Sequence, residues 1–274
     1  MRDFDYHEPK RLLDADPELA DRIRAHDAAL AAGAPASSRA AAGLALASAF
    51  VALAAVASDA SAQDGMAGLP AHVVDVLNFA LTLERLEAEF YTRGVGTSGL
   101  LMGPMLAAAD QIRKHENAHV RFLEVTLGTR ASRRPTFDFT GGGMFPDVFS
   151  NRRTFMALAQ MFEDTGVRAY KGQAAHIMVQ RTLLRQALRI HSVEARHAAQ
   201  IRRLRGQEGW ITGRSRGDLP AGADPIYSGE DNRFHFILAE PSSHVADLTS
   251  AFDEPLAKGQ VLAIVRPFIR GTMV

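Results

Sequence analysis

The chain has 274 residues, enough for one large domain or two small ones, and its hydrophobic content of 47% is ordinary for a soluble protein. Lys+Arg and Asp+Glu both number 31, so no excess of positive charge points to a nucleic-acid-binding protein. Cysteine is absent, which excludes disulfides, thiolate nucleophiles and cysteine-bound iron, so any metal must bind to oxygen and nitrogen ligands.

Residues 1–66 have the composition of a charged leader followed by an apolar signal or anchor segment. Residues 1–39 are charged and polar, whereas residues 40–57 contain no charged side chain. Ala60-Ser61-Ala62 then has the small-x-small form of a signal-peptidase site. The segment therefore predicts export to the periplasm, or a membrane anchor at residues 40–57. The alternative is an Ala-rich helix packed on a cytoplasmic protein. No arginine pair precedes the apolar run, which leaves the export route open.

Residues 67–210 predict four amphipathic helices in two pairs. The first is expected over residues 71–91, after Pro70, and the second from Pro104 to the glycine at position 128. The third follows a cap at Ser150 or Asn151 and ends at Gly172, and the fourth covers residues 176–204.

The connection between the second and third helices, residues 128–151, is more than 20 residues long and has no helical periodicity. Such a length is needed where the chain must cross the whole bundle between two parallel helices. The predicted fold is therefore all-α, an antiparallel four-helix bundle of ferritin-like topology with a long crossover between helices 2 and 3. Residues 211–274 are expected to form an irregular C-terminal extension with one short helix over 256–265.

One ligand pattern occurs twice in this bundle: a lone Glu, then a Glu-x-x-His pair. Its members are Glu84, Glu116 and His119 in the first half and Glu163, Glu194 and His197 in the second. The interval from the lone Glu to the pair is 32 residues in the first half and 31 in the second. Residues three or four apart share a helix face, and all six lie on apolar seams. Because buried, uncompensated carboxylates cost several kcal/mol, by a rough estimate, the pattern predicts a dinuclear metal site in the core.

Each lone Glu is followed seven residues later by a tyrosine, Tyr91 or Tyr170. The rings could simply fill core volume while their hydroxyls find partners. The repeated interval makes both tyrosines candidate catalytic residues beside the metal.

We expect Glu116 and Glu194 to bridge two ions. Glu84 and Glu163 would bind terminally, and each imidazole would complete one ion. Two iron ions are predicted, with manganese as the alternative, because carboxylate and imidazole ligands suit both metals.

Other acidic and imidazole side chains near the pattern have simpler explanations. Glu87 and Glu89 lie off the seam and are expected to be solvated or salt-bridged. His115, Glu116 and His119 also spell His-Glu-x-x-His, the helix motif of zinc peptidases. A peptidase would leave the second half of the repeat without a role, so His115 is expected to be exposed or to lie beside the ligands.

Taken together, the segments that carry these residues resemble the bacterial ferritin-like family that is related to the plant desiccation-related proteins. The segments are residues 77–84, 87–91, 115–119, 162–170 and 193–198, and the resemblance covers roughly residues 70–205, with a further similarity at 251–256. It implies a ferritin-like fold, frequent export, and a dinuclear site with the six ligands above and the two tyrosines beside them.

The predicted function is a diiron carboxylate protein of oxidative or desiccation stress that reacts with O2 or peroxide or oxidises ferrous iron. The alternatives are peroxide disproportionation at two manganese ions and a structural stress-protection bundle whose metal is not catalytic. The expected partners are small-molecule substrates and a second copy of the chain in a homodimer, with no nucleic acid. Membrane contact is expected only through residues 40–57.

Overall fold

The computed structural model describes residues 68–232 and 249–271, all within the second of two compact units, Ala57–Val274. The predicted leader and apolar segment, residues 1–66, lie outside the described residues. In the described part the chain is all-α except for two very short strands. The element order is α5 (Ala71–Gly96), α6 (Gly103–Leu127), η1 (Gly128–Arg130), β1 (Thr136–Phe137), α7 (Arg152–Ala174), η2 (Ala175–Ile177), α8 (Arg181–Leu204), η3 (Ala221–Tyr227), α10 (Lys258–Val265), η4 (Arg266–Phe268) and β2 (Ile269–Arg270).

The first pair of long helices, α5 and α6, begins where the prolines predict. Pro70 is the N-cap of α5, and Pro104 lies in the first turn of α6. α5 continues past residue 91 to Gly96, and at Gly94 a phenylalanine ring packs directly on the helix backbone. A Cβ at position 94 would lie 2.2 Å from Cε2 of Phe155. α6 ends before Gly128, whose φ of 56° is a conformation that favours glycine.

The second pair, α7 and α8, follows the long crossover. Asn151 caps α7 by accepting a hydrogen bond from the backbone N–H of Arg153 at 3.0 Å. The predicted end of this helix at Gly172 is wrong, because α7 continues to Ala174. Position 172 needs glycine for a different reason: a Cβ there would lie only 2.0 Å from the carbonyl oxygen of Leu256 in the C-terminal extension. α8 then begins at Arg181, after the short turn η2.

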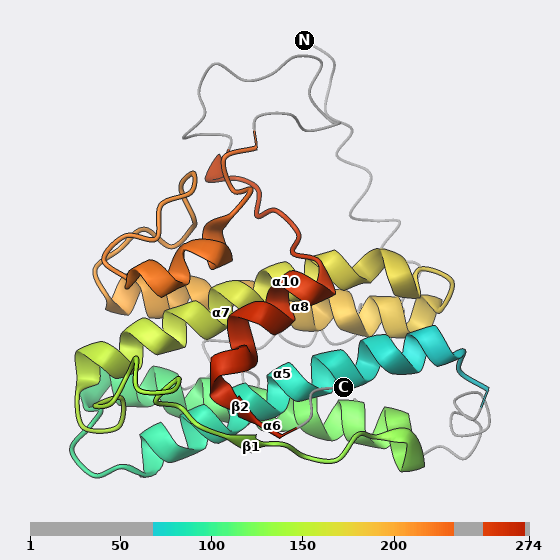
Figure 1. The fold of residues 1–274 in the computed structure, drawn as a ribbon, viewed down its shortest axis with the longest axis horizontal. Helices are drawn as coiled ribbons and strands as arrows, with labels where there is room; N and C mark the ends of the chain where they lie inside the picture. Colours follow the sequence, from blue (N-terminus) through green and yellow to red (C-terminus); the bar gives the residue numbers. More distant parts are fainter. Residues whose placement is uncertain (1–67, 233–248, 272–274) are drawn as a thin grey trace, which may run out of the picture. The chain divides into compact units, whose positions relative to one another are not determined.

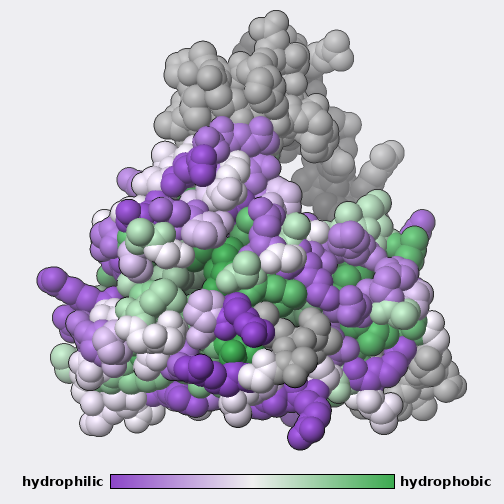
Figure 2. All heavy atoms as spheres, viewed as in Figure 1, coloured by the Kyte–Doolittle hydropathy of each residue, from purple (hydrophilic) through white to green (hydrophobic). Residues whose placement is uncertain are grey.

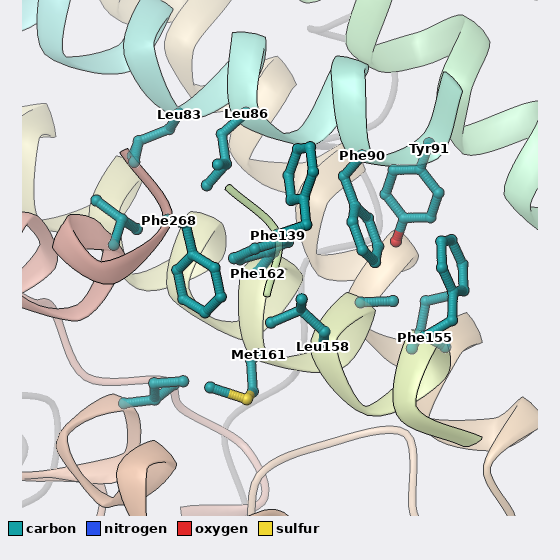
Figure 3. Close-up of a cluster of buried hydrophobic side chains, with 14 of the residues drawn as sticks. Leu83, Leu86, Phe90, Tyr91, Phe139, Phe155, Leu158, Met161, Phe162 and Phe268 are labelled. Atoms are coloured by element: carbon teal, nitrogen blue, oxygen red, sulfur yellow. The ribbon is translucent and has the colours of Figure 1, made fainter. Parts of the chain in front are cut away.

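The four long helices form a ferritin-like bundle in which α5 lies along α6 and α7 along α8 (Figure 1). Two clusters of buried hydrophobic residues fill it. One cluster contains many aromatic rings among its aliphatic residues: Figure 3 shows Phe90 and Tyr91 entering it from α5 and Phe155 and Phe162 from α7. The rings of Phe90 and Phe155 are stacked at 4.4 Å between centroids. The other cluster is mostly aliphatic and includes Tyr170. Each of the two candidate tyrosines is thus fixed in a different cluster.

The C-terminal extension is fastened to the bundle by a buried arginine of α7. Arg168 donates hydrogen bonds to the carbonyl oxygens of Ile226, Ser228 and Glu254, and its Nε lies 2.7 Å from Oε1 of Glu230. The extension also returns to the crossover, where β2 pairs antiparallel with β1 (Figure 1). Its helix α10 starts at Lys258, two residues later than predicted.

The molecular face in Figure 2 is mostly hydrophilic, with hydrophobic residues showing in smaller areas between the polar ones. Among the described helices, none is both long and apolar enough to span a bilayer.

Candidate metal centre

The structure brings the six predicted ligands together in the core of the bundle, one Glu or one Glu-x-x-His pair from each long helix. Their exposed fractions are 0% for Glu84, Glu116, Glu163 and Glu194, 1% for His119 and 4% for His197. They form two overlapping groups, the first with Glu84, Glu116, His119 and Glu194 and the second with Glu116, Glu163, Glu194 and His197. In each group, one ligand atom from every residue lies within 4.8 Å of the others. Glu116 and Glu194 belong to both groups.

Both imidazoles turn their Nδ1 atom toward the carboxylates. Nδ1 of His119 lies 3.1 Å from Glu84 Oε2, 3.2 Å from Glu116 Oε2 and 3.2 Å from Glu194 Oε1. Nδ1 of His197 lies 2.9 Å from Glu116 Oε1, 3.4 Å from Glu163 Oε2 and 3.9 Å from Glu194 Oε2. Each shared carboxylate therefore gives one oxygen to the first group and the other oxygen to the second.

The chemistry of this donor set fits a pair of divalent cations. Oε1 of Glu116, Oε2 of Glu163 and both carboxylate oxygens of Glu194 are buried and accept no hydrogen bond within the described part of the chain. Such oxygens are costly unless a cation or a proton compensates them. Four carboxylates balance the charge of two divalent ions, and oxygen and imidazole ligands suit iron and manganese. The buried clusters could thus hold metal within this fold.

In the absence of a bound cation, protons on the carboxylates and imidazoles reduce the net negative charge of the cluster. Burial raises the pKa of Glu84 to about 7, and burial with the nearby carboxylates of Glu116 and Glu84 raises the pKa of Glu194 well above its ordinary value. Burial lowers the pKa of His119, but the carboxylates of Glu84 and Glu116 outweigh it and raise that pKa well above its ordinary value. A bound metal would displace these protons.

Each of the two tyrosines makes its hydrogen bond to a ligand from the other half of the repeat. The hydroxyl of Tyr91 donates a hydrogen bond to Glu163 Oε1 at 2.6 Å, and that of Tyr170 donates to Glu84 Oε1. Burial raises the pKa of both hydroxyls well above the ordinary value, so each remains a neutral donor. Each tyrosine therefore orients the lone Glu of the opposite half.

His115 lies beside the ligands but belongs to neither group. Its Nδ1 is 2.8 Å from Nε2 of His197, and the two rings stack with centroids 5.1 Å apart. A His197 that binds metal through Nδ1 carries its proton on Nε2, which then donates to His115. This contact differs from the peptidase arrangement, in which His115 and His119 would share one ion.

The expectation that Glu87 is solvated or salt-bridged is wrong. Glu87 is only 3% exposed, and its Oε1 lies over Gly166 of α7, whose missing side chain leaves room for it beside Oε2 of the ligand Glu194. Burial first, then the carboxylates of Glu194 and Glu163, raise the pKa of Glu87 well above its ordinary value. Glu89 is salt-bridged as expected, to Arg93 and to Arg134. The sequence signal for Glu87 was Gly166, three residues after Glu163 just as Glu87 follows Glu84.

Comparison with known proteins identifies the same region. A family model described as a ferritin-like domain matches residues 72–207. The match takes in nearly all of α5 and the whole of α6, α7 and α8, with all six predicted ligands and both tyrosines. No curated protein matches the chain.

Proposed function

Because the chain belongs to the ferritin-like family through residues 72–207, we propose that its bundle holds a dinuclear centre, diiron by preference, that oxidises ferrous iron or reacts with O2 or peroxide. The observation that carries the proposal is the pair of overlapping ligand groups. A single ion would not need two carboxylates that each direct one oxygen to a different imidazole, as Glu116 and Glu194 do.

Each residue has a defined part in this proposal. Glu116 and Glu194 would hold both ions, Glu84 and His119 would complete the first, and Glu163 and His197 would complete the second. When bound, the two ions supply the electrons and the positive charge needed for oxygen chemistry. The protein fixes the ligands beforehand through the two tyrosine hydrogen bonds and the contact from His115, and it excludes bulk water by burying all six ligands.

An apolar cavity next to the site has room for a small apolar molecule such as O2. It has a volume of about 30 Å³ and lies among the four long helices, where Ala80, Leu83, Leu123, Tyr170 and Ile190 are among the residues that line it. Tyr170 connects it to the site through the hydrogen bond to Glu84. Apolar cavities bind water poorly but accept small apolar molecules. The cavity therefore suits an uncharged diatomic gas as substrate.

The test is elemental analysis of the full chain purified without added metal, followed by assays of ferrous oxidation and of peroxide consumption. We expect about two iron ions per chain, by analogy with dinuclear bundle sites, and O2-dependent oxidation of added Fe²⁺. Glu116→Ala should lose both ions, whereas Glu89→Ala, at a salt-bridged surface position, should keep them. Retention of two ions in Glu116→Ala would refute the shared-ligand assignment.

Other outcomes would select a different function. Two manganese ions with peroxide disproportionation would indicate a catalase-like reaction, and tightly held metal with neither activity would indicate a structural stress-protection bundle. Export or membrane anchoring through residues 40–57, and a homodimer, stay predictions from the sequence. Fractionation of the source cells and sedimentation of the purified protein test them.

A further inference from the structure

The two halves of the ligand repeat differ at one position that faces the site. The lone Glu, the tyrosine and the Glu-x-x-His pair occur in both halves. Three residues after the lone Glu, however, the first half has Glu87 and the second half has Gly166. These two positions face each other across the bundle core, one on α5 and one on α7.

The space that a side chain at position 166 would need is occupied by carboxylates. A Cβ placed on Gly166 would lie 3.3 Å from Oε1 of Glu87 and 3.3 Å from Oε2 of Glu194. Such contacts are tight even for one methyl group, so a larger residue would push the carboxylates away. The glycine and Glu87 thus fit each other as a pair.

Oε2 of Glu194 is the oxygen on the His197 side, since it lies 3.9 Å from Nδ1 of His197 while Oε1 lies 3.2 Å from Nδ1 of His119. Glu87 Oε1 shares the space over Gly166 with that same Oε2 atom. Glu87 itself belongs to neither ligand group, but its carboxylate lies on the same side of Gly166 as the Glu194 oxygen that faces the group of Glu163 and His197.

Glu87 has no cationic partner of its own. It is 3% exposed, and among the described residues it makes no ion pair with a lysine, arginine or histidine, whereas Glu89 does. The charges that act on it most strongly are the carboxylates of Glu194 and Glu163. A buried carboxylate directed at other carboxylates is stable only with a proton or a cation beside it. Two residues later, Glu89 shows the ordinary arrangement, paired with arginines at the surface.

We propose that Glu87 is a fifth carboxylate ligand, used by the ion that Glu163 and His197 hold. This inference rests on the proposed dinuclear site. The two ion positions are then inequivalent: the ion at His119 would have three carboxylates, and the ion at His197 would have four once the Glu87 side chain turns toward it, since Glu87 lies outside both ligand groups in the structure. Gly166 is the positioning residue that makes room for the additional ligand.

The test is calorimetric titration of the full-length, metal-free protein with Mn²⁺, which is stable in air and suits these ligands. Wild type should bind two ions. Glu87→Gln, which keeps the shape of the side chain but removes its charge, should keep one ion unchanged and weaken the other at least tenfold. Glu89→Gln is the matched control and should titrate like wild type. Gly166→Ala keeps every carboxylate yet crowds Glu87, so it should weaken the same ion as Glu87→Gln.

Double variants identify which ion is affected. In Glu84→Gln, the remaining ion is the one at His197, and adding Glu87→Gln should weaken it at least tenfold. In Glu163→Gln, the remaining ion is the one at His119, and adding Glu87→Gln should leave it unchanged. Equal loss of both ions, or two unchanged ions in Glu87→Gln, would overturn the inference. If wild type itself bound no metal, the proposed function would fail instead. Thermal melts of the metal-free variants show that each one folds.

Discussion

At the scale of single residues, each tyrosine hydroxyl donates to the lone Glu of the opposite half of the repeat, and this pairing predicts which ion the hydroxyl supports. Tyr91→Phe removes the hydrogen bond to Glu163 and should weaken the ion held by His197. Tyr170→Phe should instead weaken the ion held by His119, because its partner is Glu84. We expect about a tenfold loss in each case, the factor for a hydrogen bond of about 1.5 kcal/mol to a charged group.

Titration with Mn²⁺ in the double variant Tyr91→Phe/Glu84→Gln and its counterpart Tyr170→Phe/Glu163→Gln assigns the effects to the ions. Tyr227→Phe is a control, since that buried hydroxyl donates to Asp164, which is not a ligand. This pairing of each tyrosine with the opposite half would be disproved if each tyrosine supported the ion of its own half of the sequence.

The contact between His115 and His197 gives a second prediction. His115→Ala leaves Nε2 of His197 without this partner and frees the ring to turn. The ion at His197 should bind about 10- to 100-fold more weakly, the usual cost of losing a partner that orients a metal-bound imidazole. His191→Ala, on the same helix as His197 but near Val167 and Asp253, should bind Mn²⁺ like wild type. An equal loss in both variants would mean that His115 acts only through general stability.

These residues also show what a single sequence reveals about such a site. The Glu-x-x-His spacing is a property of one helix, so the repeat was enough to select the six side chains that the structure brings together. Glu87 and His115 have no such local pattern. The role of Glu87 depends on Gly166 of the facing helix α7, and the role of His115 depends on His197 of α8. Aligning the two halves of the repeat sets Gly166 opposite Glu87, but only the packed helices show that these two meet and that His115 lies against His197.

At the scale of elements, the four helices and the crossover follow from caps, glycines and hydrophobic periodicity, which are all local signals. The wrong helix end shows where this reasoning stops. Gly172 resembles a helix terminator in sequence, but it is needed because the chain more than 80 residues later passes directly over it at Leu256. The sequence does not distinguish a glycine that is needed because another chain segment packs closely on it from a glycine that is needed for its backbone conformation.

Arg168 makes the main buried polar contacts between the bundle and the C-terminal extension, so its replacement should lower the free energy of unfolding. Arg168→Met would leave Glu230 buried without its ion pair and three carbonyl groups without a donor. We expect the free energy of unfolding to fall by about 3–5 kcal/mol, the cost of breaking a buried pair from one side. Chemical denaturation measures the change. Adding Glu230→Gln should recover part of it, because the uncompensated charge is then gone.

Lys171→Met is the matched control for Arg168→Met, because it also removes a bond to the extension, at the carbonyl of Asp253, but from an exposed position. It should change the unfolding free energy by no more than about 0.5 kcal/mol, as is usual for surface substitutions. Equal effects of the two variants would show that burial of Arg168 adds nothing to the attachment.

Gly172→Ala tests whether the bundle and the extension are separable. The new Cβ would clash with Leu256 and should lift the extension, while the ligands stay in place because none of them lies at this contact. We expect faster proteolysis after residue 210 with Mn²⁺ affinity within about twofold of wild type, the size of a surface-type effect. Gly96→Ala, where a Cβ meets nothing within 4 Å, is the control. Loss of metal in Gly172→Ala would show that the extension supports the site.

At the scale of the whole molecule, the buried cluster links folding, pH and metal. A carboxyl whose pKa is raised on folding adds stability below its ordinary pKa, and that stability is lost as the pH rises through the raised value. For Glu84 the pKa moves from 4.5 to about 7, which corresponds to a loss on the order of 3 kcal/mol over this range. Glu194 has a raised pKa and acts in the same direction. Glu116, whose pKa is lowered because His119 and His197 outweigh its burial, contributes a constant amount above pH 5.

Metal-free protein should therefore melt at a lower temperature at pH 8 than at pH 5.5. With saturating Mn²⁺ the trend should reverse, because metal must displace these protons and binds more tightly as they leave. The two melting curves should diverge with increasing pH, and calorimetry in buffers of different ionisation enthalpy should detect proton release on binding. Curves that stay parallel from pH 5.5 to 8 would mean that the carboxylate cluster is not what the metal stabilises. The divergence thus tests, with no assay of activity, whether the core of this bundle is built around cations.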